Sequence, residues 1–149
     1  MIGHRLHPFD GVLVAAVLLL SGACAAKPEV QVSPVTRDAW AGHPYFENVK
    51  KNVAARLKYP CIANARTGVC EPLTADVGVD FGILRDGTLR YVEIARPSGY
   101  RVYDDEAVRA VRSAAPFPPV PDDVMAALPV QSTGVPIRAN FRFNVQYAR

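Results

Sequence analysis

The strongest constraint on the fold is an alternating segment that leads into a tight turn. Residues 74–84 alternate between apolar side chains and polar or small ones, which is the pattern of a strand with one buried face. Asp86-Gly87 follows at once, and this pair tolerates the positive φ that hairpin turns need. The sequence therefore predicts a β-hairpin whose second strand covers residues 89–95. The predicted core side of the first strand consists of Val77, Val79, Phe81 and Ile83.

One helix is predicted before the hairpin and another after it. Residues 45–59 carry an apolar stripe at helical spacing, and Pro60 disfavours helical geometry in the residue before it. Residues 104–115 begin with three acidic side chains, which suit the positive end of a helix dipole. Pro116 ends this second helix. The stripe of the first helix consists of Phe46, Val49, Val53 and Leu57.

Residues 137–147 have the cleanest strand pattern in the chain. Their apolar and polar side chains alternate with a strict period of two, which predicts one buried and one solvated face. Together with the hairpin and the two helices, this strand predicts an α+β fold. We expect a small antiparallel sheet of about three strands, with two helices packed on one face.

The N-terminus has the features of an export signal. Arg5 precedes an uncharged apolar run, and small residues follow the run, an order typical of a secretory signal peptide. The uncharged segment, residues 11–26, is shorter than the ~20 residues that a transmembrane helix needs. We assign residues 1–26 to a signal peptide or lipoprotein signal, and a retained N-terminal membrane anchor stays open.

Cys24 leaves two alternatives for the end of this signal. Residues 20–24 (Leu-Ser-Gly-Ala-Cys) resemble a bacterial lipobox, in which the cysteine is lipidated and becomes the new N-terminus. Ordinary cleavage after Ala25 or Ala26 is the other alternative. Lipidation of Cys24 is the one we favour, and with Cys24 either lipidated or cleaved away an even number of cysteines remains.

The two remaining cysteines are Cys61 and Cys70. In an oxidising compartment such an even remainder predicts a disulfide. The bridge closes a loop of about ten residues, worth about 2–3 kcal/mol in the chain-entropy model. Residues 27–44 contain three prolines and no sustained periodicity, so we expect a linker there and a folded domain over residues 45–149.

No pattern in the rest of the chain points to catalysis, metal binding or nucleic acid. The net charge of +3 is scattered, whereas nucleic-acid binding needs a clustered basic face. Ser98 lacks a Gly-x-Ser-x-Gly frame, and no Cys-x-x-Cys spacing suggests a metal. His43, with Cys61 or Cys70, is a weak candidate for a nucleophile pair because it lies in the expected linker. We therefore expect neither an enzyme nor a cofactor.

Five motifs, in order, resemble the C-terminal domain of the TonB family of energy transducers. Residues 57–60 (Leu-Lys-Tyr-Pro) are similar to the Tyr-Pro that ends the family's first helix, and residues 77–89 to its central hairpin. Residues 98–111 resemble its Ser-Gly helix entry, and residues 115–119 (Ala-Pro-Phe-Pro-Pro) its Pro-Phe-Pro-Pro exit. The final strand resembles its alternating apolar end. The resemblance covers residues 45–147.

The resemblance implies a periplasmic protein-interaction module of a Gram-negative bacterium, which binds outer-membrane transporters in energy-coupled uptake. In that family a box peptide of the transporter adds as a strand to the sheet, and an exposed edge with unpaired backbone groups permits such addition. We expect residues 137–147 to be near this edge. The expected partner-binding residues are Leu57, Lys58, Tyr59, Pro60, Arg138, Asn140, Arg142 and Asn144.

A second interpretation stays open. The C-terminal domain of TolA shares much of the pattern, and TonB proper carries a serine and a histidine in an inner-membrane helix. Here the apolar segment has Ser21 and no histidine, and the expected linker reaches only about 60 Å. The alternative is a TolA-like or orphan envelope adaptor, anchored by a lipid on Cys24, without energy transduction. Inner-membrane motor proteins and a homodimer formed through an exposed edge are further partner hypotheses.

Mass spectrometry of the mature N-terminus tests these alternatives. If Cys24 is lipidated, the purified chain should begin at a diacylglyceryl-modified Cys24, because lipidation precedes cleavage at that residue. A chain that begins at Met1 contradicts the lipoprotein hypothesis and supports a retained anchor. A chain that begins at Ala26 or Lys27 supports ordinary cleavage.

Overall fold

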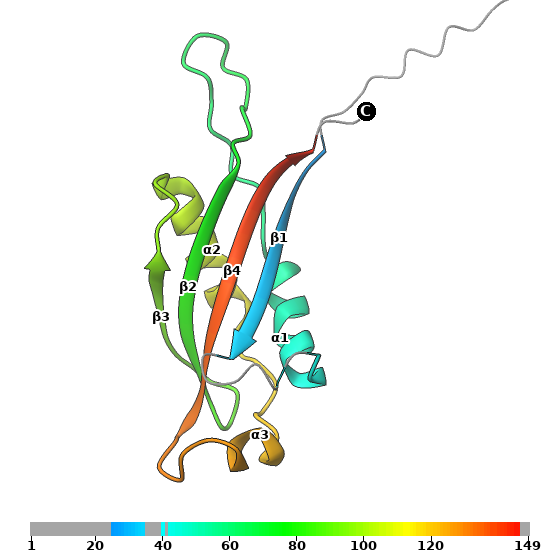
Figure 1. Cartoon of the computed structure of the whole chain (residues 1–149). Coiled ribbons are helices and arrows are strands. Elements are labelled where there is room, and N and C mark those ends of the chain that lie inside the picture. Colours follow the sequence, from blue (N-terminus) through cyan, green and yellow to red (C-terminus); the bar gives the residue numbers. More distant parts are fainter. Residues whose placement is uncertain (1–24, 35–39, 41, 147–149) are drawn as a thin grey trace, which may run out of the picture.

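The protein is represented by a computed structural model, which describes residues 25–34, 40 and 42–146. The strands of the described part form a single antiparallel sheet in the order β1-β4-β2-β3. Helices α1 and α2 lie on one side of this sheet (Figure 1). The predicted α+β class is confirmed. The elements are β1 (Ala25–Pro34), α1 (Pro44–Ala54), β2 (Ala75–Leu84), β3 (Leu89–Arg96), α2 (Arg101–Ala114), α3 (Asp122–Ala126) and β4 (Gly134–Gln146).

The centre of the fold is the pairing of β2 with β4. These strands run antiparallel from Ala75 opposite Phe143 to Leu84 opposite Gly134. Their apolar side chains point to the same side, where α1 and α2 cover them. The predicted core side of β2 is confirmed, since all four of its residues are fully buried. The buried side chains of β4 are Val135, Ile137, Ala139, Phe141 and Phe143.

The sheet has one strand more than the sequence predicts, and this strand lies where the end of the signal (residues 25–26) and the first part of the linker (residues 27–34) were expected. Residues 25–34 form β1, which pairs antiparallel with β4. Pro28 and Pro34 interrupt the sequence signal for a strand. An edge strand nevertheless tolerates proline, because the position that lacks an N–H can face away from the neighbouring strand. Val30 is buried and Val32 is partly buried in the core.

Because β1 is present, the prediction that residues 137–147 lie at an edge of the sheet is wrong. β4 pairs with β1 on one side and with β2 on the other. Within the described residues, the edges of the sheet are therefore β1 and β3. The pairing of β4 with β1 joins segments that are more than 100 residues apart in the chain. Local sequence patterns do not encode such a pairing.

The first helix ends earlier than expected, at Ala54 rather than Tyr59. The amides of Arg56 and Leu57 donate to the carbonyls of Val53 and Ala54, which are the short-range bonds of a tightened last turn. The backbone then turns toward α2. There the Lys58 N–H donates to a Glu106 carboxylate oxygen at 2.6 Å.

Two further differences concern the second half of the chain. Helix α2 begins at Arg101, three residues before the predicted start. Asp104, in its first turn, accepts a 2.8 Å hydrogen bond from the Ser98 N–H and so connects the Ser98-Gly99 turn to the helix. The short helix α3 was not predicted. The predicted disulfide between Cys61 and Cys70 is confirmed, and it closes a loop that leads into β2.

The proline-rich connector after α2 packs on the turn of the β2–β3 hairpin. The Phe117 N–H donates to the Gly87 carbonyl at 3.0 Å, and the Val120 N–H donates to the Arg85 carbonyl at 3.0 Å. The Phe117 ring stacks on Phe81 with the centroids 5.9 Å apart. The connector thus closes the end of the core between the hairpin and the helices.

This contact predicts different costs for two glycine substitutions. Gly87 and Gly99 both have positive φ, 91° and 86°. A Cβ at Gly87 would overlap the Phe117 carbonyl, whereas a Cβ at Gly99 meets nothing within 4 Å. We expect Gly99→Ala to lower the free energy of unfolding by about 1 kcal/mol, and Gly87→Ala by about 3 kcal/mol. Urea unfolding measures the free energy of unfolding of both variants. Equal losses would contradict the close approach of Phe117 to Gly87.

Candidate partner-binding surface

The polar side of β4 lies on the sheet face opposite α1 and α2. Arg138, Asn140 and Arg142 are exposed there, and Asn144 is half-buried. They alternate with residues that are buried beneath the helices. Four of the eight sequence-predicted binding residues therefore share one open face.

The two arginines of this face are paired within the sheet. The Arg138 guanidinium donates to both carboxylate oxygens of Asp80 on β2, at 2.7 Å each. Arg142 Nε donates to Asp76 Oδ1 at 3.1 Å. The hydrogen bond to Asp80 raises the pKa of Arg138. These exposed pairs set side-chain orientation more than stability.

Strand β1 continues the same polar rows. Glu29 is the register partner of Arg142, Gln31 of Asn140 and Ser33 of Arg138. Glu29 and Gln31 line a hollow of about 360 Å³ on this face, together with Asp76, Arg96, Asn140, Phe141 and Arg142. The open face is thus a grid of polar and charged side chains that runs from β1 across to β3.

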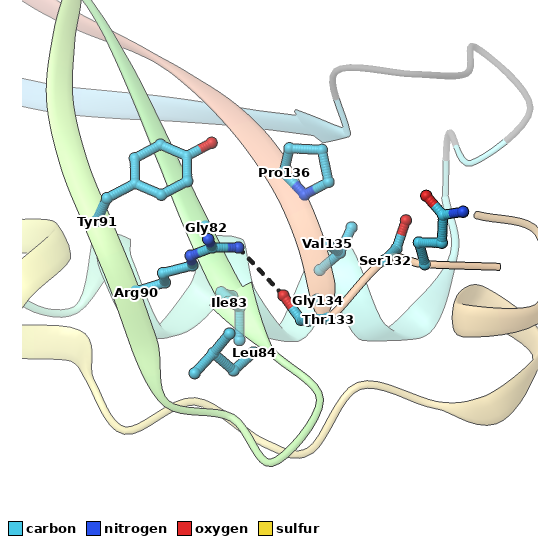
Figure 2. A pocket seen from close by; sticks show the side chains of 11 residues that line it. Gly82, Ile83, Leu84, Arg90, Tyr91, Ser132, Thr133, Gly134, Val135 and Pro136 are labelled. Carbon is cyan, nitrogen blue, oxygen red and sulfur yellow. Dashed lines mark hydrogen bonds between the residues drawn. The ribbon is translucent and has the colours of Figure 1, made fainter. Parts of the chain in front are cut away.

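A second hollow, of about 390 Å³, lies where β2, β3 and the start of β4 meet. Figure 2 shows the Arg90 guanidinium directed at the Thr133 hydroxyl, to which it donates at 3.1 Å. The Tyr91 ring lies over Gly82, where a Cβ would meet it. No sequence pattern predicts this hollow, because the loop that lines it, with Gln131 and Ser132, carries no strand or helix pattern.

The other four predicted residues, Leu57–Pro60, lie in the helical layer. The Tyr59 hydroxyl donates to the Leu73 carbonyl at 2.6 Å. Its ring meets Phe143 edge-on at 5.7 Å and Tyr103 at 5.9 Å. Tyr59 therefore packs on the buried side of β4, whereas Arg138, Asn140 and Arg142 face the opposite side. The structure does not bring the two predicted groups onto one surface.

Strand β3 is the edge of the sheet on the side of the β2–β3 hairpin. Within the described residues β3 pairs with β2 alone, so its outer backbone groups face away from the sheet. Two of its apolar side chains, Tyr91 and Ile94, are exposed. Unpaired backbone groups of this kind are what an added strand pairs with.

The residues weighed for catalysis have structural partners instead. His43 Nε2 lies 3.2 Å from Asp123 Oδ2, and this hydrogen bond lowers the pKa of Asp123. His43 Nδ1 also accepts from the Tyr45 N–H and caps α1. The Ser98 hydroxyl bonds to the backbone of Tyr100. In the described part of the chain, no group of three His, Cys, Asp or Glu side chains could hold a metal ion.

The comparison with known families concerns this same set of elements. Residues 55–145 match the family described as the Gram-negative bacterial TonB protein C-terminal. The chain belongs to the TonB C-terminal family. Its domain is therefore a periplasmic domain of the TonB type, in a family of protein-interaction domains. No curated protein and no solved structure gave a significant match.

The match to the TonB C-terminal family does not extend over the whole sheet. It includes β2, β3, α2, α3 and most of β4, whereas β1 and α1 precede it. Without β1, the outer side of β4 would have no strand beside it. Strand β1, like α1, lies outside the family-matched residues.

The predictions of a membrane anchor and of a lipidated Cys24 are not tested by the described residues. None of the helices in the described residues is long and apolar enough to cross a membrane. Cys24 and the preceding residues of the predicted signal lie outside the described residues, whereas its last two residues, Ala25 and Ala26, belong to β1.

The environments of two tyrosines predict how stability depends on alkaline pH. Burial raises the pKa of Tyr45 to about 12, and burial and neighbouring Tyr103 raise the pKa of Tyr59 to about 12. The folded state therefore favours the neutral phenols. The two tyrosines contribute fully to the free energy of unfolding below the ordinary tyrosine pKa of 10.0. This contribution is lost as pH rises through about 12.

Tyrosinate absorbance during an alkaline titration checks this prediction. We expect two phenols to titrate near pH 12, one of which disappears in Tyr59→Phe and the other in Tyr45→Phe. Loss of structure, followed by circular dichroism, should begin only above the ordinary tyrosine range. Full tyrosinate absorbance with unchanged structure would contradict the assignment.

Proposed function

We propose that this TonB-type domain binds an extended periplasmic segment of an outer-membrane transporter, which adds as a strand to the sheet. In energy-coupled uptake the domain would be the part that holds the transporter. The proposal takes its partner class from the TonB family and its binding mode from the sheet.

One observation carries the proposal. The outer side of β4 pairs with a ten-residue segment that lies outside the family-matched residues. That segment contributes one fully buried side chain among its described ones, Val30, so the pairing depends largely on backbone hydrogen bonds. A position beside β4 that holds such a strand suits a partner that binds mainly through its backbone and takes the place of β1.

The side chains beside this edge support the same site. A strand next to β4 has Arg138, Asn140 and Arg142 of β4 on its polar side. On its other side lies α1, with Val49 and Val53 in the core. In this proposal Asn144 flanks the end of the added strand. Residues 57–60 act indirectly, because Tyr59 packs on Phe143 and supports the end of β4.

The experiment is a titration of the isotope-labelled protein, purified as cells process it, with synthetic peptides from the periplasmic N-terminal segments of several transporters. We expect amide resonances of β4 to shift, because an added strand forms hydrogen bonds with that backbone. A proline at the centre of the peptide should weaken binding by about tenfold, since it removes a backbone donor and restricts φ.

Scrambled peptides of the same composition are the control. Shifts confined to β3 would place the added strand at the other edge and would keep strand addition. If no peptide moves the amides of either β4 or β3, the proposed function is wrong.

A further inference from the structure

The outer edge of β4 is occupied in this chain by the chain's own strand. β1 pairs with β4 in an unbroken register, from Ala25 opposite Gln146 to Pro34 opposite Ile137. This is the edge that the family-matched residues alone would leave open. A partner strand and β1 would therefore compete for the same backbone groups.

Side chains hold β1 less firmly than the two central strands, β2 and β4. Of its described side chains, Val30 is 2% exposed and Val32 is partly buried. β2 and β4 each bury five apolar side chains. Among the described residues, no side-chain hydrogen bond or ion pair joins β1 to another element, and the one that β1 makes joins Gln31 to Glu29 within the strand.

The pattern of β1 describes what its site accepts. Val30 and Val32 enter the core between β4 and α1, while Glu29, Gln31 and Ser33 lie on the polar face. Glu29 is placed opposite Arg142, beside the hollow that also holds Arg96. The site therefore takes an acidic side chain followed by aliphatic side chains one and three positions later.

β1 also ends the sheet. Pro28 and Pro34 lack backbone donors, so the free side of β1 is a poor template for a further strand. A new strand reaches β4 only where β1 has left it.

We propose that β1 is a displaceable internal strand, which closes the partner-binding edge of β4 and mimics the partner. Resting on the proposed function, this inference specifies the partner segment: an extended strand with an acidic residue at one position and aliphatic residues one and three positions after it. β1 is tethered to the domain and so acts at high effective concentration. With β1 in place, the protein therefore binds the partner strand more weakly than it would with β1 released.

Two variants of the full chain test the inference. In Gln31→Cys/Asn140→Cys, a disulfide locks β1, because these exposed residues are direct register partners and opposite residues in a sheet lie within disulfide range. Gln31→Ser/Asn140→Ser is its matched reference. In Val30→Asp, a carboxylate replaces the most buried side chain described in β1 and should release the strand.

The first probe is a synthetic peptide with the sequence of residues 27–34, titrated by fluorescence anisotropy. We expect Val30→Asp to bind it about tenfold more tightly than the wild type or better, because affinity scales with the fraction of open edge. The locked variant should show no binding. A Glu29→Lys peptide should bind the released variant more weakly, because it places a cation against Arg142.

Two results would overturn the inference. One is equal binding by the locked variant and its serine reference, which would place the peptide elsewhere, such as at β3. The other is absence of peptide binding to a folded Val30→Asp variant, with folding checked from the amide spectrum of the β2–β3 hairpin. If Val30→Asp does not fold, the comparison of the locked variant with its reference decides.

A transporter peptide in the same assays separates this inference from the proposed function. If it binds the wild-type, locked and released proteins equally, the proposed function stands and the displaceable strand is wrong. If it binds none of them while the β1 peptide binds the released variant, the displaceable strand stands and the proposed function fails.

Discussion

The structure depends on one contact, the antiparallel pairing of β2 with β4. Its register places Val77 opposite Phe141 and Phe81 opposite Ile137, so the apolar side chains of both strands face the same side. A shift by one residue would turn one set to solvent. Helices α1 and α2, the Tyr59 region and the connector pack on the surface that this register creates.

The motifs that identify the family mostly hold this arrangement together. Phe117 of the Pro-Phe-Pro-Pro segment stacks on Phe81 and bonds to the hairpin turn at Gly87. Tyr59, in the segment that follows α1, packs on Phe143 of β4. These residues are buried or hydrogen-bonded within the domain, so the motifs that they form stabilise the fold. The parts available to a partner are the strand edges and the polar sheet face.

Features that depend on neighbouring residues could be predicted from the sequence, whereas features that depend on contacts between distant segments could not. The alternation in β2 and β4 predicted their buried sides correctly, because a strand side chain's direction repeats every two residues. The disulfide followed from counting cysteines. Strand β1 was missed, since Pro28 and Pro34 disrupt the local pattern and its pairing partner lies at the other end of the chain. The predicted edge at residues 137–147 failed for the same reason.

From the order of residues alone, the fold class, the hairpin, the disulfide and the family follow, because each depends on local periodicity, turn chemistry or short motifs. Only the folded chain shows that Arg138 and Arg142 are paired with aspartates of β2. Only it shows that β4 is covered by β1 and that Leu57–Pro60 lie on the opposite side of the sheet from those arginines. These features depend on which strands become neighbours, and that choice is made by the shared core of distant segments.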